Sequence, residues 1–115
     1  MQMSELKIVL EELVAQIHNT LGNNLERIVL YGSYARGDNE EDSDVDIMVL
    51  TNLSSEENRK YDRELNKIFS RLGLEHDIFL SMYLKDKATY EYWFPVLPFY
   101  QNIEKDGIVL YQANK

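Results

Sequence analysis

Two aspartates and a glycine–serine pair stand at a spacing that could bind a metal ion and a phosphate group. Gly32 and Ser33 follow the apolar run 28–31, and Asp44 and Asp46 open the next apolar run. A glycine after a strand lets the backbone approach a ligand closely, and a serine can cap a helix whose first N–H groups face a phosphate. Residues two apart on a strand share a face, so the two carboxylates repel each other unless a cation lies between them. Such oxygen ligands favour Mg²⁺, and the segment is equipped for metal-assisted displacement at phosphorus.

This segment resembles the signature of the polymerase-β-type nucleotidyltransferases, which is Gly-Ser, ten residues, then Asp-x-Asp. The longer strings GSYARG and DSDVDIMVL are similar to the minimal nucleotidyltransferases, the MNT branch, and NIEKDGIVLYQ at 102–112 resembles the usual end of those proteins. The resemblance covers nearly the whole chain. It implies an α/β (α+β) fold in which helices flank a small mixed sheet. The alternative interpretation is a hairpin-like connection with a solvated acidic loop, in which Ser33 only caps a helix.

The resemblance also implies a role for each residue of the signature. Gly32 and Ser33 would hold the β- and γ-phosphates of ATP, the substrate, while Asp44 and Asp46 would hold Mg²⁺, with two ions expected and Mn²⁺ able to replace them. A third carboxylate on the next strand would complete the metal site and take the proton of the attacking hydroxyl, and Asp77 matches that position. In the alternative interpretation, Asp77 is an acid at the start of a strand that is exposed to water and has no part in metal binding.

Arg36 lies in the segment that would face the nucleotide. It could contact phosphate, or it could pair with the acids that follow it, and the sequence favours neither. His76 is a weaker candidate for a metal ligand than Asp77.

Composition restricts the classes of protein to which the chain can belong. Its 115 residues suit one domain, 1–115, with one core, and its 12 basic and 20 acidic residues give a net charge of −8. An acidic surface argues against direct binding of long nucleic acid, and the acidic run 38–46 would repel a triphosphate that lacks metal. There is no cysteine, no signal-like N-terminus and no apolar run long enough to span a membrane. We therefore expect a cytoplasmic protein without a membrane partner.

Hydrophobic periodicity and turn residues predict the elements that position the signature. The second strand should be central, because both of its faces are apolar toward its end, and Ser54 with Glu57 forms a capping box. The predicted elements are a helix over 4–21, a strand over 25–31, a short helix or turn over 33–37, a strand over 44–50, a helix over 54–72 ended by Gly73, a strand over 75–81, a short helix before Pro95, a helix over 98–105 and an extended end over 108–111.

Two further patterns could mark surfaces that bind a partner. A row of cations recurs every four residues on the second long helix, at Arg59, Arg63, Lys67 and Arg71. This row is either a solvated face or a docking stripe for an acidic partner or for RNA which that partner holds. The aromatic residues after Met82 should partly close the core, and any that stay exposed would form a partner surface.

The resemblance implies a function as well. MNT proteins of this type resemble antitoxins paired with HEPN-domain ribonuclease toxins, which they silence by transferring AMP from ATP to a tyrosine. The alternatives are an antitoxin that neutralises its toxin by binding alone, and a nucleotidyltransferase of a small molecule, which would need a homo-oligomer to build an acceptor site.

Overall fold

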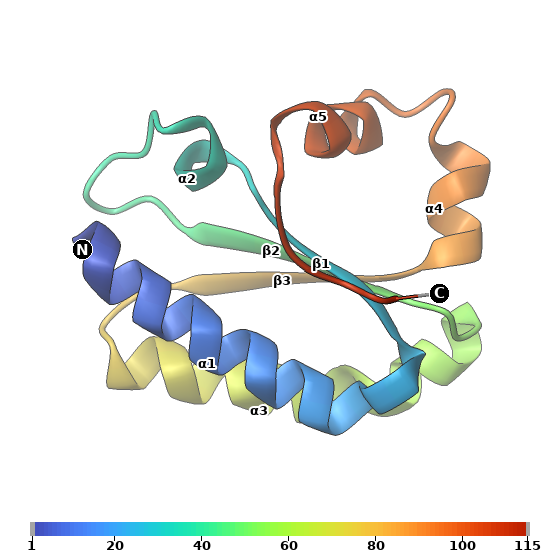
Figure 1. The fold of residues 1–115 in the computed structure, drawn as a ribbon, viewed down its shortest axis with the longest axis horizontal. Helices are drawn as coiled ribbons and strands as arrows, with labels where there is room; N and C mark the ends of the chain where they lie inside the picture. Colours follow the sequence, from blue (N-terminus) through green and yellow to red (C-terminus); the bar gives the residue numbers. More distant parts are fainter. Residues whose placement is uncertain (1, 115) are drawn as a thin grey trace.

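A four-stranded sheet with the strand order β3-β2-β1-β4 forms the centre of the protein (Figure 1). The structure is a computed structural model, and it describes residues 2–114. β2 pairs in parallel with β3 and antiparallel with β1, which pairs antiparallel with β4. The sheet is therefore mixed and β2 is central, as predicted. The strands are β1 (Leu25–Tyr31), β2 (Val45–Thr51), β3 (Leu80–Asp86) and β4 (Ile108–Gln112).

Two long helices, α1 (Met3–Leu21) and α3 (Ser55–Glu75), cover one face of the sheet (Figure 1). Their apolar residues recur at three- and four-residue steps, so one stripe of each helix faces the strands. Leu13 of α1 and Leu65 of α3 are fully buried in a cluster that also contains Ile47 of β2. The capping box of Ser54 and Glu57 is formed at the start of α3 as predicted.

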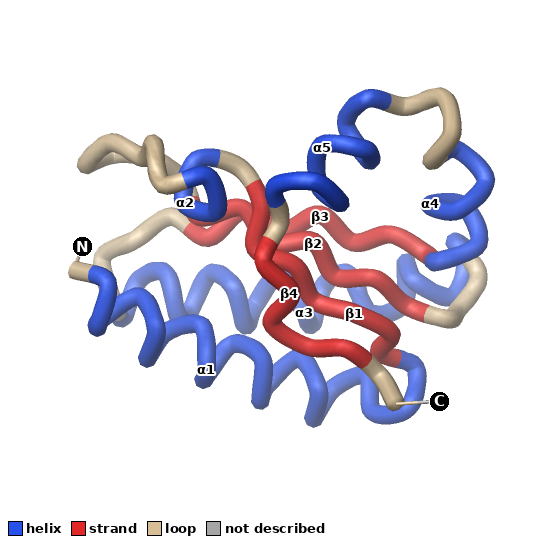
Figure 2. Tube along the Cα trace, turned by 45° about the horizontal axis from the view of Figure 1, so that its top comes forward, coloured by secondary structure: helices blue, strands red, loops and turns tan. Residues whose placement is uncertain are grey.

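Two short helices, α4 (Lys87–Trp93) and α5 (Pro98–Asp106), lie on the opposite face (Figure 2). The third short helix, α2 (Ser33–Arg36), follows the end of β1, and its Tyr34 is buried in the first cluster. Side chains alternate along β2, so Met48 and Leu50 point to the face that α4 and α5 cover and join a second apolar cluster with residues of these two helices. Both faces of β2 are thus covered along its C-terminal half, which explains why the strand is apolar on both sides.

A chain of polar contacts ties α4 and α5 to the sheet. The hydroxyls of Tyr83 and Tyr100 lie 2.7 Å apart, and the hydroxyl of Tyr90 donates to the carboxylate of Glu104 at 3.2 Å. Glu104 in turn forms an ion pair of 3.3 Å with Arg27 of β1. The chain joins β3, α5, α4 and β1, so the short helices are held by directional contacts in addition to apolar packing.

The predicted strand over 75–81 is wrong, because β3 begins only at Leu80 and runs to Asp86. Helix α3 extends through Glu75, and Gly73 is a buried helical residue rather than its C-terminal cap. The N–H of Ile78 donates to the carbonyl of Gly73 at 2.9 Å, so the chain turns back tightly against the helix. A side chain at Gly73 would fill that space, which explains why a glycine stands there.

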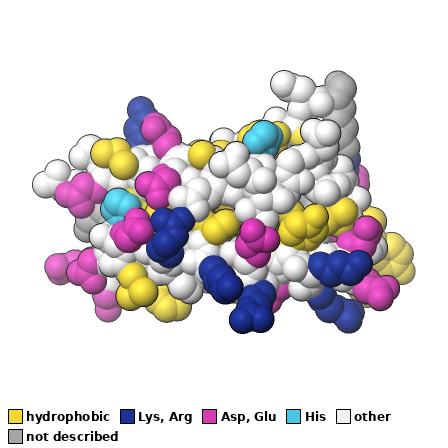
Figure 3. All heavy atoms as spheres, turned by 90° about the horizontal axis from the view of Figure 1, so that it is seen from below, with side chains coloured by type: hydrophobic (Ala, Val, Ile, Leu, Met, Phe, Trp, Pro, Cys, Tyr) yellow, Lys and Arg dark blue, Asp and Glu magenta, His cyan; other side chains and the backbone are white. Residues whose placement is uncertain are grey.

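The outer surface of α1 and α3 carries acidic and basic side chains close together (Figure 3). All four cations of the predicted row are exposed, and Arg71 pairs with Glu75 at 3.1 Å and contacts Gln16. After Met82, Tyr90 and Tyr100 are buried, whereas Tyr92, Trp93, Val96 and Phe99 are exposed. The aromatic region is therefore divided between core and surface, as predicted. No helix in the described part of the chain is both long enough and apolar enough to cross a membrane.

Replacing Gly73 with alanine should destabilise the protein. The added Cβ would lie 2.6 Å from the carbonyl oxygen of Ile78, and a backbone oxygen cannot move away as a flexible side chain can. We expect an overpacking cost of about 1–3 kcal/mol, which outweighs the helix propensity that alanine gains. Urea denaturation measures it, with Ser70→Ala on the exposed side of the same helix as the control. Equal stability of both variants would contradict the tight turn.

Candidate functional site

The turn after β1 brings backbone against the carboxylate of Asp46. Gly32 has φ 77°, and a Cβ at this position would overlap Oδ2 of Asp46. Only glycine combines that backbone conformation with such a close approach. The pairing of Tyr31 with Asp46 across β1 and β2 fixes the turn above the start of β2. The glycine and the second aspartate of the signature therefore meet in space.

Asp44 and Asp46 form an acidic pair whose charge the protein does not neutralise. Burial raises the pKa of Asp46, and repulsion from Asp44 raises it further, while Arg36 acts in the opposite direction. Within residues 2–114, neither carboxylate receives a hydrogen bond or an ion pair from a side chain. Such a pair is unfavourable without a counter-ion. An exposed and a half-buried carboxylate with an excess of negative charge fit a hard divalent cation.

Ser33 and Arg36 lie on the short helix α2 that follows Gly32. The predicted capping role of Ser33 is wrong: Gly32 is the N-cap residue, no side chain caps the helix, and Ser33 is its first residue. Nε of Arg36 pairs with Asp38 at 3.1 Å, which is the pairing alternative left open by the sequence. Arg36 is nevertheless close enough to Asp46 to lower its pKa. The helix thus places a cation near Asp46, and its first residue, Ser33, directly follows the glycine that contacts Asp46.

Asp77 does not join the acidic pair. It lies in the turn between α3 and β3, where it is exposed and has φ 52°. Contact of this segment with β2 begins only at Phe79, whose carbonyl accepts from the N–H of Val45. Among the residues that the structure describes, no group of three or more histidine, cysteine, aspartate or glutamate side chains could hold a metal ion. The predicted three-carboxylate site with Asp77 is therefore not formed. His76 lies in the same turn and is no closer to a metal site.

Two residues that the sequence analysis missed flank Asp46. Tyr31 pairs with it on β1 and Ser81 pairs with it on β3, and partners in register place their side chains on the same face. Burial, with the charge of Asp46, raises the pKa of Tyr31 to about 12, so its hydroxyl stays protonated and can donate at neutral pH. The alternation of side chains along β1 could have indicated Tyr31. Ser81 could be placed beside Asp46 only from the register of β3, and the bounds of that strand were wrongly predicted.

An aromatic ring of α5 closes this region on one side. The ring of Phe99 meets those of Tyr31 and Tyr83 edge-on, with centroids 5.6 and 5.4 Å apart. Because these tyrosines stand on β1 and β3, Phe99 bridges across β2 beyond Asp46. The acidic pair is thus open toward the loop 38–44 and bounded by aromatic rings toward α5.

Comparisons with known proteins identify the family of the chain. A family model for the nucleotidyltransferase domain matches residues 10–109. Two relatives from Methanocaldococcus jannaschii bear the name "Putative protein adenylyltransferase". One, MJ0141, is 36% identical over 84 residues, covering 73% of this chain and 83% of the relative. The other, MJ0604, is 26% identical over 112 residues, covering 95% of this chain and all of the relative.

Solved structures share the fold. A structure from Sulfolobus solfataricus, described as that of "a putative nucleotidyltransferase", superposes with a TM-score of 0.53 at 24% identity, covering 97% of this chain and 81% of that one. A toxin–antitoxin structure with AMP-PNP gives a TM-score of 0.52 at 21% identity, covering 90% of this chain and 74% of that one. At these identities the likeness is one of fold, and it agrees with the mixed sheet and its flanking helices.

Replacing Asp46 with asparagine should raise the melting temperature at pH 7 in the presence of a chelator. A carboxyl whose pKa is raised by folding opposes folding once it is ionised. The cost is absent below its ordinary pKa of 3.8 and appears as the pH rises through the folded-state value. The gain from asparagine should therefore shrink as the pH falls toward 3.8. Thermal unfolding at several pH values measures it, with Asp42→Asn in the exposed loop as the control; a loss of stability at pH 7 would contradict the repulsion.

Proposed function

The chain belongs to the nucleotidyltransferase domain family, and we propose that it transfers AMP from ATP to a tyrosine of a HEPN-domain toxin, so acting as an antitoxin. The observation that carries the proposal is the pair of unneutralised carboxylates at Asp44 and Asp46, set against the backbone of Gly32. The pair accounts for a metal requirement, and the glycine turn accounts for phosphate binding. The names of the M. jannaschii relatives support a protein as the acceptor.

Each residue of the site has a part in this reaction. Asp44 and Asp46 would hold Mg²⁺ or Mn²⁺, which supplies charge stabilisation at the reacting phosphate when bound. The backbone at Gly32 and the hydroxyl of Ser33 would bind the β- and γ-phosphates. Arg36 would exchange its surface pairing with Asp38 for a phosphate oxygen, because a guanidinium binds phosphate in a bidentate manner. Tyr31 would donate a hydrogen bond to the same anionic group.

The transfer step is a displacement at the α-phosphorus of ATP. The acceptor oxygen forms a bond to phosphorus while the bond between that phosphorus and the oxygen bridging to the β-phosphate breaks, and pyrophosphate leaves. Within residues 2–114 no third carboxylate joins Asp44 and Asp46 in a metal-binding group, so the hydroxyl proton would pass to water. The protein's own contribution is therefore orientation and electrostatic stabilisation rather than general-base catalysis.

The toxin as acceptor is supported by two solved structures of similar fold. Among the proteins of similar fold, one solved structure is of a toxin–antitoxin named MntA-HpeT, and another is of a toxin–antitoxin with AMP-PNP. Direct recognition of nucleic acid is not part of the proposal.

A second candidate function is neutralisation by binding alone. The observation that favours it is the absence of Asp77 from the acidic pair, which leaves two carboxylates where three were predicted. Such an antitoxin would mask its toxin and transfer nothing. The two functions make opposite predictions for a variant that lacks both aspartates of the pair, because a binding-only antitoxin does not need them.

The transfer reaction is tested by incubating the purified protein with ATP, Mg²⁺ and a HEPN-domain toxin. Intact mass spectrometry should show the toxin gaining AMP, and neither EDTA samples nor the double variant Asp44→Asn with Asp46→Asn should show the gain. We expect the double variant to lose at least about 100-fold in rate, the scale of losing a metal clamp at the transition state.

Asp42→Asn, two residues before the pair, is the matched control and should transfer at the normal rate. A toxin whose mass never changes in the presence of the wild-type protein would refute the proposed reaction. Neutralisation of the toxin by the double variant, measured as restored growth, would favour the binding-only function.

Replacing Ser81 with aspartate should strengthen metal binding. Ser81 is the residue of β3 in register with Asp46, so the new carboxylate would join the pair as a third oxygen donor. Without metal, the added repulsion should lower the melting temperature, whereas Mg²⁺ should raise it more than in the wild type. Thermal unfolding across a Mg²⁺ series measures both effects, and Ser70→Asp on α3 is the control. An unchanged response to Mg²⁺ would place position 81 outside the metal site.

A further inference from the structure

An exposed phenylalanine of α5 stands on the face of the sheet to which Asp46 points. Side chains alternate along β2, so Asp46 shares its face with Met48, which belongs to the apolar cluster of α4 and α5. Phe99, in the first turn of α5, contacts two tyrosines of that face and is nevertheless 44% exposed. An exposed aromatic ring in such a place offers a flat surface on which another ring can stack.

The register of the strands places the ring of Phe99 beside Asp46 along β2. Tyr31 on β1 pairs with Asp46, and Tyr83 on β3 pairs with Met48. The ring of Phe99 meets the rings of both tyrosines, with centroids 5.6 and 5.4 Å apart. The positions of Asp46 and Met48 are about 7 Å apart along the strand, and Phe99 spans the pair of tyrosines that flank them. It therefore borders the acidic pair on the side away from the turn after β1.

The site and the ring follow one another in the order of the parts of a nucleoside triphosphate. In the proposed function, the turn at Gly32 binds the β- and γ-phosphates and Asp46 lies at the α-phosphate. The nucleoside is attached to the α-phosphate, and Phe99 is the next feature in that direction. Figure 1 shows the same order, with α2 near the start of β2 and α5 farther along the strand. In the opposite direction, the loop 38–44 contains no aromatic side chain.

A base can lie parallel to the ring of Phe99. The rings of Tyr31 and Tyr83 are each inclined to it by 78° and that of Tyr100 by 39°, and in the described part of the chain no ring lies parallel to it. The parallel, offset position that aromatic pairs favour is therefore not taken by another side-chain ring. The three tyrosines also fix the orientation of the phenyl ring, which reduces the side-chain freedom that is lost on binding.

We propose that the ring of Phe99 is the stacking surface for the base of the nucleoside triphosphate. The proposal rests on the function proposed above and adds where the base of its substrate is bound. The triphosphate is held by the glycine turn and the metal, and the base lies on the phenyl ring, so separate contacts bind the two ends of the substrate. Because stacking on an aromatic side chain contributes to affinity, binding of the nucleoside part depends on Phe99, whereas binding of the phosphates does not.

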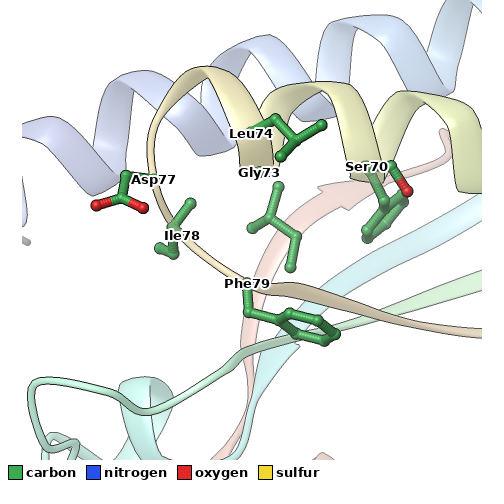
Figure 4. A pocket seen from close by; sticks show the side chains of 8 residues that line it. Ser70, Gly73, Leu74, Asp77, Ile78 and Phe79 are labelled. Atoms are coloured by element: carbon green, nitrogen blue, oxygen red, sulfur yellow. The ribbon is translucent and has the colours of Figure 1, made fainter.

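The strongest competing surface is a groove between the end of α3 and the start of β3 (Figure 4). Its volume is about 550 Å³, and its walls include Phe79, which is 67% exposed. The groove is also lined by Phe69 and Leu80 of the apolar cluster that α1 and α3 cover, and Val45 belongs to the same cluster. Asp46 follows Val45 on β2 and points to the opposite face. A base in this groove would lie across the sheet from the carboxylate.

Trp93 provides a matched control position. It is also aromatic, and it is 45% exposed, compared with 44% for Phe99. Its ring meets that of Tyr92, with centroids 5.1 Å apart. It is the last residue of α4, a helix that begins after the C-terminal end of β3, whereas Asp46 is near the start of β2. Trp93 is therefore an exposed ring that is remote from the acidic pair.

The test is calorimetric titration with α,β-methylene-ATP and, separately, with inorganic triphosphate, each with Mg²⁺ and without toxin. A methylene group replaces the bridging oxygen of the analogue, so the analogue binds but cannot transfer AMP. Phe99→Ala should lower the affinity for the analogue at least about fivefold, the lower end of what one stacked base contributes, and should leave the affinity for inorganic triphosphate unchanged. Phe99→Tyr, which keeps the ring, should retain the affinity for the analogue, and Trp93→Ala should change neither affinity.

Three results would each overturn the proposal. The first is a wild-type protein that does not bind the analogue, and the second is an unchanged affinity of Phe99→Ala for it. The third is a loss by Phe99→Ala that is equal for the analogue and for inorganic triphosphate, because the ring would then support the whole site rather than the base.

The outcome is separable from that of the proposed function. If the wild-type protein binds the analogue through Phe99 but never transfers AMP to the toxin, the reaction fails and the stacking surface stands. If it transfers AMP and Phe99→Ala does so with an unchanged KM for ATP, the stacking surface fails and the reaction stands.

Discussion

The contact between the backbone of Gly32 and the carboxylate of Asp46 is the constraint on which the site depends. It requires a residue without a side chain at the end of β1, and it requires β1 and β2 to pair so that Tyr31 faces Asp46. The antiparallel pairing of these two strands converts a sequence separation of fourteen residues into direct contact. The loop between them is free to be acidic, since it is held at both ends by the sheet. The remaining elements cover this hairpin and fix its position.

Much of this arrangement could be predicted from the sequence, because the physical signals are local. β1 was predicted at its observed bounds, α1 was predicted to within one residue, and the capping box of Ser54 and Glu57 marked the start of α3. The apolar character of both faces of β2 placed that strand in the middle of the sheet. The meeting of Gly32 with Asp46 then followed from the turn between two adjacent strands.

The prediction failed where local signals conflicted with packing. Gly73 looks like a helix cap, but it is needed because the carbonyl of Ile78 passes close to it, and the helix continues to Glu75. The apolar run after Asp77 looks like a strand, yet hydrogen bonding to β2 as a strand begins only at Leu80. This shift moved Asp77 out of the site and put Ser81 beside Asp46. Register between strands depends on contacts far apart in sequence, and a single-sequence pattern does not contain them.

The tyrosine chain that joins α5 to β1 and β3 has a consequence for how the molecule opens. Phe99 and Tyr100 are neighbours on one helical turn; the first packs on the rings beside the acidic pair and the second shares a hydroxyl contact with Tyr83. α5 therefore cannot detach without uncovering the tyrosine rings beside Asp46. Local unfolding proceeds in cooperative units of this kind, so the amide protons of α5 and those of the neighbouring stretches of β1 and β3 belong to one exchange unit. Any molecule that holds the tyrosine rings in place will slow hydrogen exchange in a helix that it never touches.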